Sequence, residues 1–230
     1  MKIVVTGASQ GIGYEIVKAL VSDTEHEVFA IARNKKKLKS LEKYALNATY
    51  HYCAFDLLEE DYHKELIPEI VKCLGKVDVL IHNAGLLISK PLQDLTNKDF
   101  DDLFNMNTKS AFKLVRDLLP FFNPNAHIVN ISSMGGFQGS AKFPGLSLYS
   151  ASKGALAILS ECMAEELKEQ HIKVNTLAIG AVQTEMLAKA FPGYKAPVKA
   201  EEMAGFIINF AQEGHQFLNG KIIPVSLSTP

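Results

Sequence analysis

The chain has 230 residues, of which 47% are hydrophobic and 21% charged, and its formal net charge is -1. These values are typical of one soluble domain with a large core, so we expect a single domain over residues 1–230. The balanced charge argues against nucleic acid or an anionic membrane as a partner. The three cysteines lie far apart, which favours a reducing cytoplasm over a disulfide scaffold or a metal site. The first predicted strand begins at residue 2 and no apolar run approaches about 18 residues, so we expect neither a signal peptide nor a membrane span.

Apolar runs and amphipathic segments alternate along the chain. We predict strands near residues 2–6, 27–32, 49–53, 77–81, 126–131, 172–178 and 221–225. Helices are predicted near residues 11–21, 35–45, 60–74, 99–121, 149–170 and 200–213. This alternation predicts an α/β fold, a doubly wound parallel sheet with helices on both faces. The irregular stretches 134–148 and 185–199 follow carboxyl ends of predicted strands, where such sheets bind ligands.

A glycine-rich segment, TGASQGIG at residues 6–13, joins the first strand to the first helix. Gly7 permits a tight turn, Gly11 lets the backbone approach a pyrophosphate, and Gly13 lets the helix pack closely on the sheet. Glycine also marks ordinary turns, so the inference depends on the strand before the segment and the helix after it. Together they predict a phosphate-binding turn for a dinucleotide.

Arg33 directly follows the second predicted strand and lies 20 residues beyond Gly13, the last glycine of this turn. An acidic residue at this place binds the ribose hydroxyls of NAD, whereas an arginine accommodates the additional phosphate of NADP. The chain has the arginine and no acid, and Ser9 adds a hydroxyl, so we predict NADP. The alternative is that Arg33 and the following lysines, residues 35–37, form the solvated start of a helix.

Tyr149 and Lys153 are four residues apart in a predicted helix and therefore share one face. A lysine cation beneath a phenol favours the ionised phenol, which can act as a general acid or base. Ser133, at the end of the fifth predicted strand, supplies a hydroxyl for a substrate oxygen beside Tyr149. Taken alone, such a pair is more often surface packing with a solvated lysine.

These motifs, in this order, resemble the short-chain dehydrogenase/reductase family over nearly the whole chain. The further matches are Asp56 after the third strand, Asn83-Ala84-Gly85 after the fourth, Asn107, and the stretch from Asn175 to Met186. The resemblance implies a seven-stranded Rossmann-like sheet and the catalytic residues Asn107, Ser133, Tyr149 and Lys153. It implies cofactor contacts from Gly7, Ser9, Gly11, Ile12, Gly13, Arg33, Asp56, Leu57, Asn83, Ala84, Gly85, Tyr149, Lys153, Gly180, Val182 and Thr184, and no metal.

By the same resemblance, Asp56 meets the adenine amino group and Thr184 holds the nicotinamide carboxamide. Asn107 holds a water in a proton relay through Lys153. Two alternatives stay open: Asp56 caps the next helix, and Asn83 is a structural bridge between strands. Asn107 is a poor helix former, so its place inside a predicted helix favours a functional or kinking role.

The chain departs from the family pattern in several places. His82 replaces a common asparagine, and we interpret it as a structural substitution rather than a catalytic histidine. Ile179 replaces the usual proline before Gly180, which predicts a less rigid loop. The connection from Ser133 to Tyr149 is longer than usual and is expected to bulge, and Ser133 is preferred over Ser132 as the residue that faces Tyr149. The usual acidic-Gly-Gly ending is also missing.

The implied activity is that of an NADP(H)-dependent oxidoreductase that interconverts a carbonyl compound and its alcohol, with Tyr149 as general acid and base. The alternatives are a non-catalytic NADP(H)-binding regulator or redox sensor and, with less support, a sugar-nucleotide epimerase or dehydratase. The apolar residues of 134–148 and 185–199 either form a lid over a small-molecule substrate or pack on the core or a neighbouring subunit. Apolar surface on the helices at 99–121 and 149–170 predicts a homodimer or homotetramer.

Overall fold

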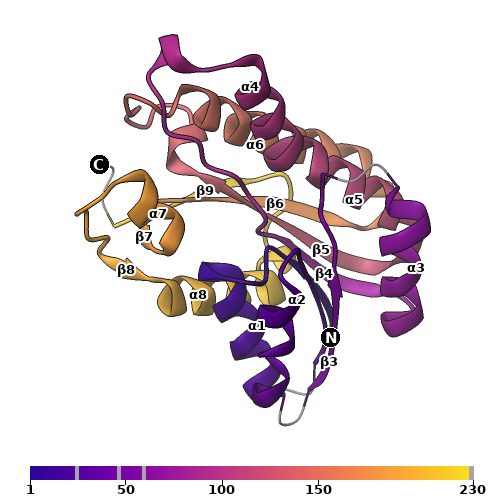
Figure 1. The fold of residues 1–230 in the computed structure, drawn as a ribbon. Coiled ribbons are helices and arrows are strands. Elements are labelled where there is room, and N and C mark those ends of the chain that lie inside the picture. Colours follow the sequence, from indigo (N-terminus) through magenta and orange to yellow (C-terminus); the bar gives the residue numbers. More distant parts are fainter. Residues whose placement is uncertain (24–25, 46–47, 59–60, 228–230) are drawn as a thin grey trace.

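The computed structural model describes residues 1–23, 26–45, 48–58 and 61–227. Its centre is a seven-stranded sheet in the order β3-β2-β1-β4-β5-β6-β9, and every neighbouring pair is parallel (Figure 1). The strands are β1 (Lys2–Thr6), β2 (Glu27–Ala32), β3 (Thr49–Ala54), β4 (Val77–His82), β5 (Phe122–Ser133), β6 (Lys173–Ile179) and β9 (Ile222–Val225). The predicted doubly wound parallel sheet is therefore confirmed.

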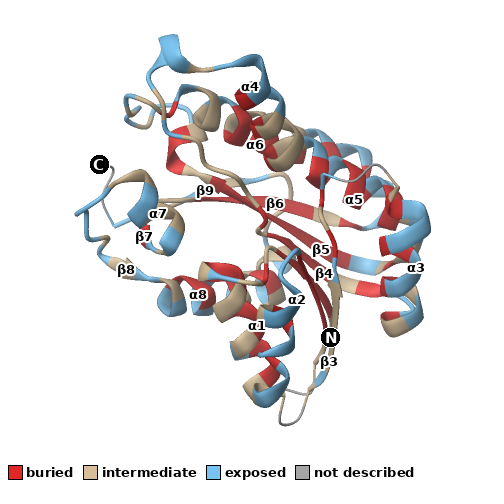
Figure 2. Cartoon of the chain, viewed as in Figure 1, coloured by how far each residue is buried: buried red, intermediate tan, exposed pale blue. Residues whose placement is uncertain are grey.

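Helices cover both faces of this sheet and bury its two apolar surfaces (Figure 2). One layer contains α1 (Gly11–Asp23), α2 (Lys35–Lys39) and α8 (Ala200–Glu213), and the other contains α3 (Tyr62–Leu74), α5 (Ser110–Leu118) and α6 (Ser147–Glu166), with α4 (Asn97–Phe104) beside α6. Successive strand residues point to opposite faces. Val4 thus packs in the core beneath α3, α5 and α6, whereas Ile3 and Val5 pack beneath α1, α2 and α8.

Three predicted helices have different bounds in the structure. The segment 35–45 is a short helix, α2, followed by a 3-10 turn at Glu42–Tyr44, because four lysines among five residues repel one another along the helix. The segment 99–121 is divided into α4, a π-helical turn at Asn105–Lys109, α5 and a 3-10 turn at Leu119–Phe121. The third helix, predicted over 149–170, is α6, which begins at Ser147 and ends at Glu166. Residue 60, where the helix at 60–74 was predicted to begin, lies outside the described residues.

The direction in which successive strands are added to the sheet changes between β1 and β4. The chain runs from β1 outward through β2 to β3, then returns to β4 on the other side of β1 and continues outward. The loops that leave β1 and β4 consequently diverge and open a crevice at the carboxyl ends of these strands. Beyond the sheet, β7 (Val182–Gln183) and β8 (Val198–Lys199) form a small ribbon that flanks α7 (Glu185–Ala190). Among the described residues, no helix has the length and apolar character needed to cross a membrane.

Candidate active site

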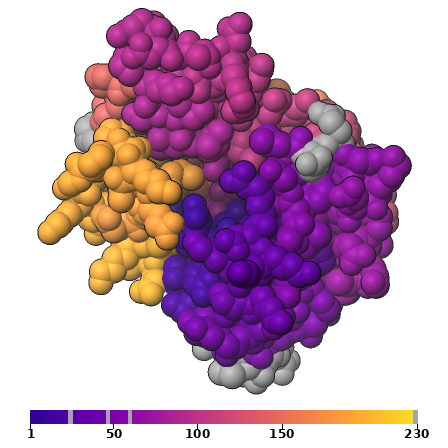
Figure 3. Space-filling model, viewed as in Figure 1, coloured from indigo at the N-terminus to yellow at the C-terminus, as the bar shows by residue number. Residues whose placement is uncertain are grey.

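A cleft of about 740 Å³ lies over the crevice between β1 and β4. Figure 3 shows the surface hollowed where the indigo N-terminal segment meets the orange segment that follows β6. Thirteen of the predicted cofactor residues line it: Gly7, Ser9, Gly11, Ile12, Arg33, Asp56, Leu57, Asn83, Ala84, Gly85, Tyr149, Lys153 and Thr184. Three do not, namely Gly13, Gly180 and Val182. Phe55, Met106 and Ile131 also line the cleft, and the sequence offered no chemical signal for these apolar residues.

The glycine-rich turn needs its glycines for different reasons. Gly7 and Gly11 have φ values of 70° and 56°, in the left-handed region that residues with a Cβ disfavour. Gly13 has no such φ, but a Cβ built on it would lie 2.4 Å from both the Gly7 carbonyl oxygen and Asn83 Nδ2. A Cβ would therefore fill the space that brings α1 against the turn, and the amides at the start of α1 stay directed toward the cleft. This cradle fits the pyrophosphate of a dinucleotide.

Asn83 joins the ends of β4 and β1. Its Nδ2 donates to the carbonyl oxygen of Thr6 at 3.1 Å and to that of Gly7 at 3.4 Å. The Ala84 amide donates to Thr6 Oγ1 at 3.0 Å. Asn83 is thus a bridge between strands, as one of the two sequence interpretations held, and its position on the cleft wall also keeps it beside any ligand bound there.

His82 continues this network into the helical layer. Its Nδ1 lies 3.3 Å from Thr6 Oγ1, and its Nε2 lies 3.2 Å from Ser110 Oγ. Ser110 Oγ donates to the Met106 carbonyl oxygen, so Nε2 carries the proton that is donated to Ser110. The buried ring connects β1, β4 and the start of α5, and it does not line the cleft. Burial, together with a smaller effect of the Lys153 cation, lowers the pKa of His82 to about 3.

A second buried histidine, His127, has its pKa lowered by burial to about 4. Both side chains are neutral when folded but gain a proton in the unfolded chain below the ordinary pKa of about 6.5. The free energy of unfolding therefore falls as pH falls below about 6.5, by about 2 kcal/mol per histidine between pH 7 and pH 5. We expect His82→Asn to remove about half of this loss in urea denaturation at the two pH values. If the free energy of unfolding of His82→Asn fell between pH 7 and pH 5 by as much as that of the wild type, His82 would not be the group that titrates.

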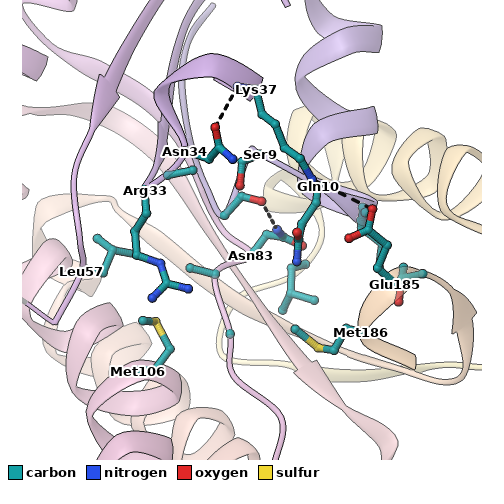
Figure 4. Close-up of a pocket in the computed structure, with 18 of the residues that line it drawn as sticks. Ser9, Gln10, Arg33, Asn34, Lys37, Leu57, Asn83, Met106, Glu185 and Met186 are labelled. Carbon is teal, nitrogen blue, oxygen red and sulfur yellow. Dashed lines mark hydrogen bonds and ion pairs between the residues drawn. The ribbon is translucent and has the colours of Figure 1, made fainter. Parts of the chain in front are cut away.

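Basic side chains gather at one end of the cleft (Figure 4). Arg33 follows β2, is 71% exposed, and lies 3.7 Å from Asp56 through its Nη1. Lys35, Lys36 and Lys37 also line the cleft, and Lys37 reaches toward Glu185 at 4.0 Å. Asp56 does not cap the next helix, because it accepts from the Leu58 amide and the N-cap of α3 is Asp61. Lys35, Lys36 and Lys37 are also the largely exposed first residues of α2, as the alternative held, so both descriptions apply to them.

Tyr149 lines the cleft and has Ser133 beside it, where the cleft adjoins a second cavity. The Ser133 side chain lies within hydrogen-bonding reach of the Tyr149 hydroxyl. Ser133 Oγ accepts from the Gly135 amide at 3.2 Å, which leaves its own proton free to be donated elsewhere. Ser132 Oγ instead donates to the Lys153 carbonyl oxygen at 2.8 Å. Ser133, rather than Ser132, is therefore the serine beside the phenol.

Lys153 is buried below Tyr149 in the first turns of α6. Its ammonium donates to the Ile131 carbonyl oxygen at 2.8 Å, and burial lowers its pKa to about 8. Burial raises the pKa of Tyr149, and the Ser133 hydroxyl acts in the opposite direction. The expectation that the lysine cation lowers the pKa of this phenol is thus wrong for the chain alone, because desolvation of the phenol dominates and Lys153 is not among the groups that shift it.

Asn107 lies in the π-helical turn and is fully buried. Its Oδ1 accepts from the Leu86 amide at 2.7 Å, while its Nδ2 donates to the Leu86 carbonyl oxygen and to Ser152 Oγ, each at 2.9 Å. Both amide protons are used, so the side chain clamps the loop after β4 to α6. The regular α-helix is interrupted at this residue, as its poor helix propensity predicts. The side chain binds groups outside its own helix, and these contacts accompany the π-helical turn.

The segment after β6 carries the remaining predicted residues. Thr184 caps α7 through Oγ1, which accepts from the Leu187 amide at 3.2 Å, and its methyl group faces Gly11. The Gly180 amide donates to the Val225 carbonyl oxygen at 2.9 Å. Ile179 is itself the last residue of β6 and pairs with both β5 and β9. The backbone that leaves β6 is therefore held on two sides where the family usually has proline.

A second cavity, which we call the side pocket, adjoins the cleft at Tyr149 and has a volume of about 270 Å³. It shares Ile12, Tyr149, Thr184 and Met186 with the cleft. Its other lining residues are Leu87, Ser133, Met134, Gly135, Phe143, Leu146, Ile179, Gly180, Ala181, Val182, Leu187, Phe191 and Tyr194. Gly180 and Val182 thus border this pocket instead of the cleft. Several apolar residues of the two irregular stretches lie here, whereas Phe137 lines a separate surface hollow.

The family model described as short chain dehydrogenase matches residues 1–195. The chain belongs to this family. Members are oxidoreductases that use a nicotinamide cofactor, NAD(H) or NADP(H). The crevice at the switch between β1 and β4, the glycine cradle and the Ser133–Tyr149 pair occur here together, as the sequence resemblance implied.

Relatives and solved structures cover nearly the whole chain. The chain is 29% identical over 235 residues to the 3-oxoacyl-(acyl-carrier-protein) reductase of Thermotoga maritima, covering 96% of this chain and 94% of that protein. It is 30% identical over 245 residues to the gluconate 5-dehydrogenase of Gluconobacter oxydans, covering 97% and 92%. A mutant short-chain dehydrogenase/reductase of Serratia marcescens has a TM-score of 0.87 and 26% identity, covering 98% of this chain and 96% of that chain.

Proposed function

We propose that the chain is an NADP(H)-dependent oxidoreductase that interconverts a carbonyl compound and its alcohol, with Tyr149 as general acid and base. The observation that supports this most directly is the meeting of Ser133 and Tyr149 where the cleft joins the side pocket. A compound in the side pocket can place one oxygen between these two hydroxyls while its carbon faces the cleft.

The chain's own residues manage the oxygen and its proton. Tyr149 donates its phenolic proton to the carbonyl oxygen during reduction, and it accepts that proton from the alcohol during oxidation. Ser133 donates a hydrogen bond to the same oxygen. Burial keeps the Tyr149 phenol protonated at neutral pH, which suits a general acid. When bound in the cleft, a reduced nicotinamide would supply a hydride to the carbonyl carbon, and this hydride together with the proton from Tyr149 would convert the carbonyl to an alcohol.

Lys153 and Asn107 have positioning and binding roles in this proposal. The Lys153 ammonium uses one donor on Ile131, which leaves two for the ribose hydroxyls of the cofactor. Asn107 fixes the loop after β4 against α6 and thereby keeps Gly85 close to Lys153, since a Cβ on Gly85 would lie 3.2 Å from the Lys153 Nζ. Any water in a proton relay then depends on Lys153 and on backbone groups, because the Asn107 amide protons are already donated.

The cleft wall offers a place for each part of the cofactor. We assign the pyrophosphate to the glycine cradle and the adenine to Asp56 and Leu57. The nicotinamide end is assigned to Thr184. Incubation with NADPH and a panel of carbonyl compounds, followed by the absorbance of the reduced nicotinamide, tests the activity. Binding of NADPH without turnover of any compound would favour a cofactor-binding regulator instead.

The preference for NADP over NAD is proposed from Arg33, Ser9 and the lysines at the adenosine end of the cleft. We expect Arg33→Asp to weaken NADPH binding by about tenfold to a hundredfold, because a charge-assisted hydrogen bond to a phosphate is lost and a like charge replaces it. Lys39→Asp makes the same charge change in α2 but does not line the cleft, so it serves as the control. Dissociation constants for NADPH and NADH measure the effect, and equal affinities of the wild type for both would refute the preference.

The predicted homodimer or homotetramer remains a proposal. Phe112 on α5 and Ile158 on α6 are 41% and 59% exposed, which leaves apolar surface on the two helices that were expected to pair. We expect light scattering at micromolar concentration to give a multiple of the 25.3 kDa chain mass. A mass equal to one chain would contradict the proposal.

A further inference from the structure

The side pocket has no charged group in its wall. None of the described residues that line it is Asp, Glu, Lys, Arg or His. Lys142, the basic residue of the neighbouring loop, donates instead to the Phe137 carbonyl oxygen and to Ser140 Oγ. A carboxylate or phosphate inside the pocket would therefore lose its hydration without gaining a cation, which is costly.

The polar side chains of the pocket are four hydroxyls, those of Ser133, Tyr149, Thr184 and Tyr194. Ser133 and Tyr149 converge on one oxygen. Thr184 Oγ1 already accepts from the Leu187 amide, and Tyr194 is 42% exposed to solvent. A polyol would therefore leave most of its other hydroxyls without side-chain partners there.

The rest of the wall is apolar and the space is small. Apolar side chains from four separate segments form it, among them Ile12, Leu87, Met134, Phe143, Leu187 and Phe191. A volume of about 270 Å³ lies just below the range of about 300–1,000 Å³ that is usual for ligand pockets. The pocket thus suits a compound the size of a substituted aromatic or alicyclic ring.

We propose that the side pocket selects small uncharged ketones or aldehydes whose reacting carbonyl is their only strongly polar group, such as aryl methyl ketones. This inference rests on the proposed oxidoreductase function and names its substrate class. The uncharged wall disfavours polyhydroxy acids and compounds with a charged group near the carbonyl, and the small number of hydroxyls in the wall disfavours ketoses. A thioester substrate, of the kind named for the Thermotoga maritima relative, is a separate case that the experiment includes.

A matched pair of probes tests the inference on the wild-type protein with NADPH. 4-Methylacetophenone and 4-acetylbenzoate have the same ring and carbonyl and differ by a methyl group against a carboxylate. We expect kcat/KM to be at least about a hundredfold higher for the methyl compound, because the carboxylate is desolvated without a partner. L-Sorbose and the N-acetylcysteamine thioester of 3-oxobutyrate are the polyol and thioester arms, and both are expected to be poorer than the methyl compound.

A positive charge placed in the wall should weaken the preference for the uncharged compound. Leu187→Arg introduces a cation in α7 at the pocket, whereas Ala188→Arg introduces it at the exposed neighbouring residue that does not line the pocket. We expect Leu187→Arg to lower the ratio of kcat/KM for 4-methylacetophenone to kcat/KM for 4-acetylbenzoate by at least about tenfold. The reason is a charge-assisted hydrogen bond between the new arginine and the carboxylate. Ala188→Arg should leave the ratio unchanged.

Saturation-transfer NMR on the same two probes supplies a readout that does not need turnover. Stronger binding of 4-methylacetophenone supports the pocket's preference. If the protein binds it selectively but reduces no carbonyl, the oxidoreductase proposal fails and the pocket's selectivity stands. If 4-acetylbenzoate, L-sorbose or the thioester is reduced as efficiently, the selectivity is wrong and the oxidoreductase proposal stands. Equal NMR binding of the two probes with no turnover overturns both.

Discussion

Tyr149→Phe is expected to lower the turnover number for carbonyl reduction by at least about a hundredfold. The substitution keeps the aromatic ring and removes only the hydroxyl, so the proton donor is lost while the packing of α6 remains. General acid catalysis is typically worth about 10² to 10⁴ in rate. The Ser133 hydroxyl cannot replace the phenol as an acid at neutral pH, although it continues to bind the carbonyl oxygen.

The measurements are steady-state kinetics on an active substrate and the NADPH dissociation constant. NADPH binding should be nearly unchanged, because the glycine cradle and Lys153 remain in place. Lys153→Ala should instead weaken both NADPH binding and turnover. The substitution removes the ammonium that is proposed to bind the cofactor ribose, and it removes the cation near the Tyr149 phenol. Tyr44→Phe, in the 3-10 turn outside both cavities, is the matched control. Wild-type turnover by Tyr149→Phe would mean that the proton comes from another group.

The parallel sheet could be predicted from the sequence because most of its strands contain a short apolar run and helical segments separate them. The strands read as continuous apolar runs since both faces of the sheet are buried, and Ile3, Val4 and Val5 show this within three residues. The glycine-rich turn was equally readable, because its chemistry depends on the backbone of one continuous segment. The strands and the glycine-rich turn could be predicted because each depends on the residues of one continuous segment.

The interruption of the helix at 99–121 was not predictable in its form. The π-helical turn depends on Asn107 binding the backbone of Leu86 and the side chain of Ser152, which are distant in sequence. The raised pKa of Tyr149 was missed for a similar reason. Helical spacing places Tyr149 and Lys153 on one face, but it says nothing of how strongly the surrounding chain desolvates the phenol. The uncharged side pocket likewise combines four segments that no local pattern connects.

Gly13→Ala is expected to weaken NADPH binding by at least about tenfold and to lower the free energy of unfolding by about 1–3 kcal/mol. The added methyl group would lie 2.4 Å from the Gly7 carbonyl oxygen, and one of the two contacted atoms belongs to the backbone of the cradle. Either α1 moves away from the turn or the turn itself shifts, and both changes move the amides that face the pyrophosphate. The Asn83 side chain, also 2.4 Å from the new methyl, would be displaced from its bonds to Thr6 and Gly7.

Gly205→Ala separates this steric effect from the general effect of alanine in a helix. Gly205 lies inside α8, is exposed, and a Cβ built on it has no atom within 4 Å. Alanine there should raise the free energy of unfolding by about 0.5–1 kcal/mol and leave NADPH binding unchanged, because alanine favours the helix over glycine. The same intrinsic gain applies to Gly13, so any net loss at that residue measures the clash with the cradle. Calorimetric titration with NADPH and urea denaturation of both variants make the comparison. If Gly13→Ala behaved like Gly205→Ala in both measurements, the close contact between α1 and the glycine turn would not be what holds the cofactor site in shape.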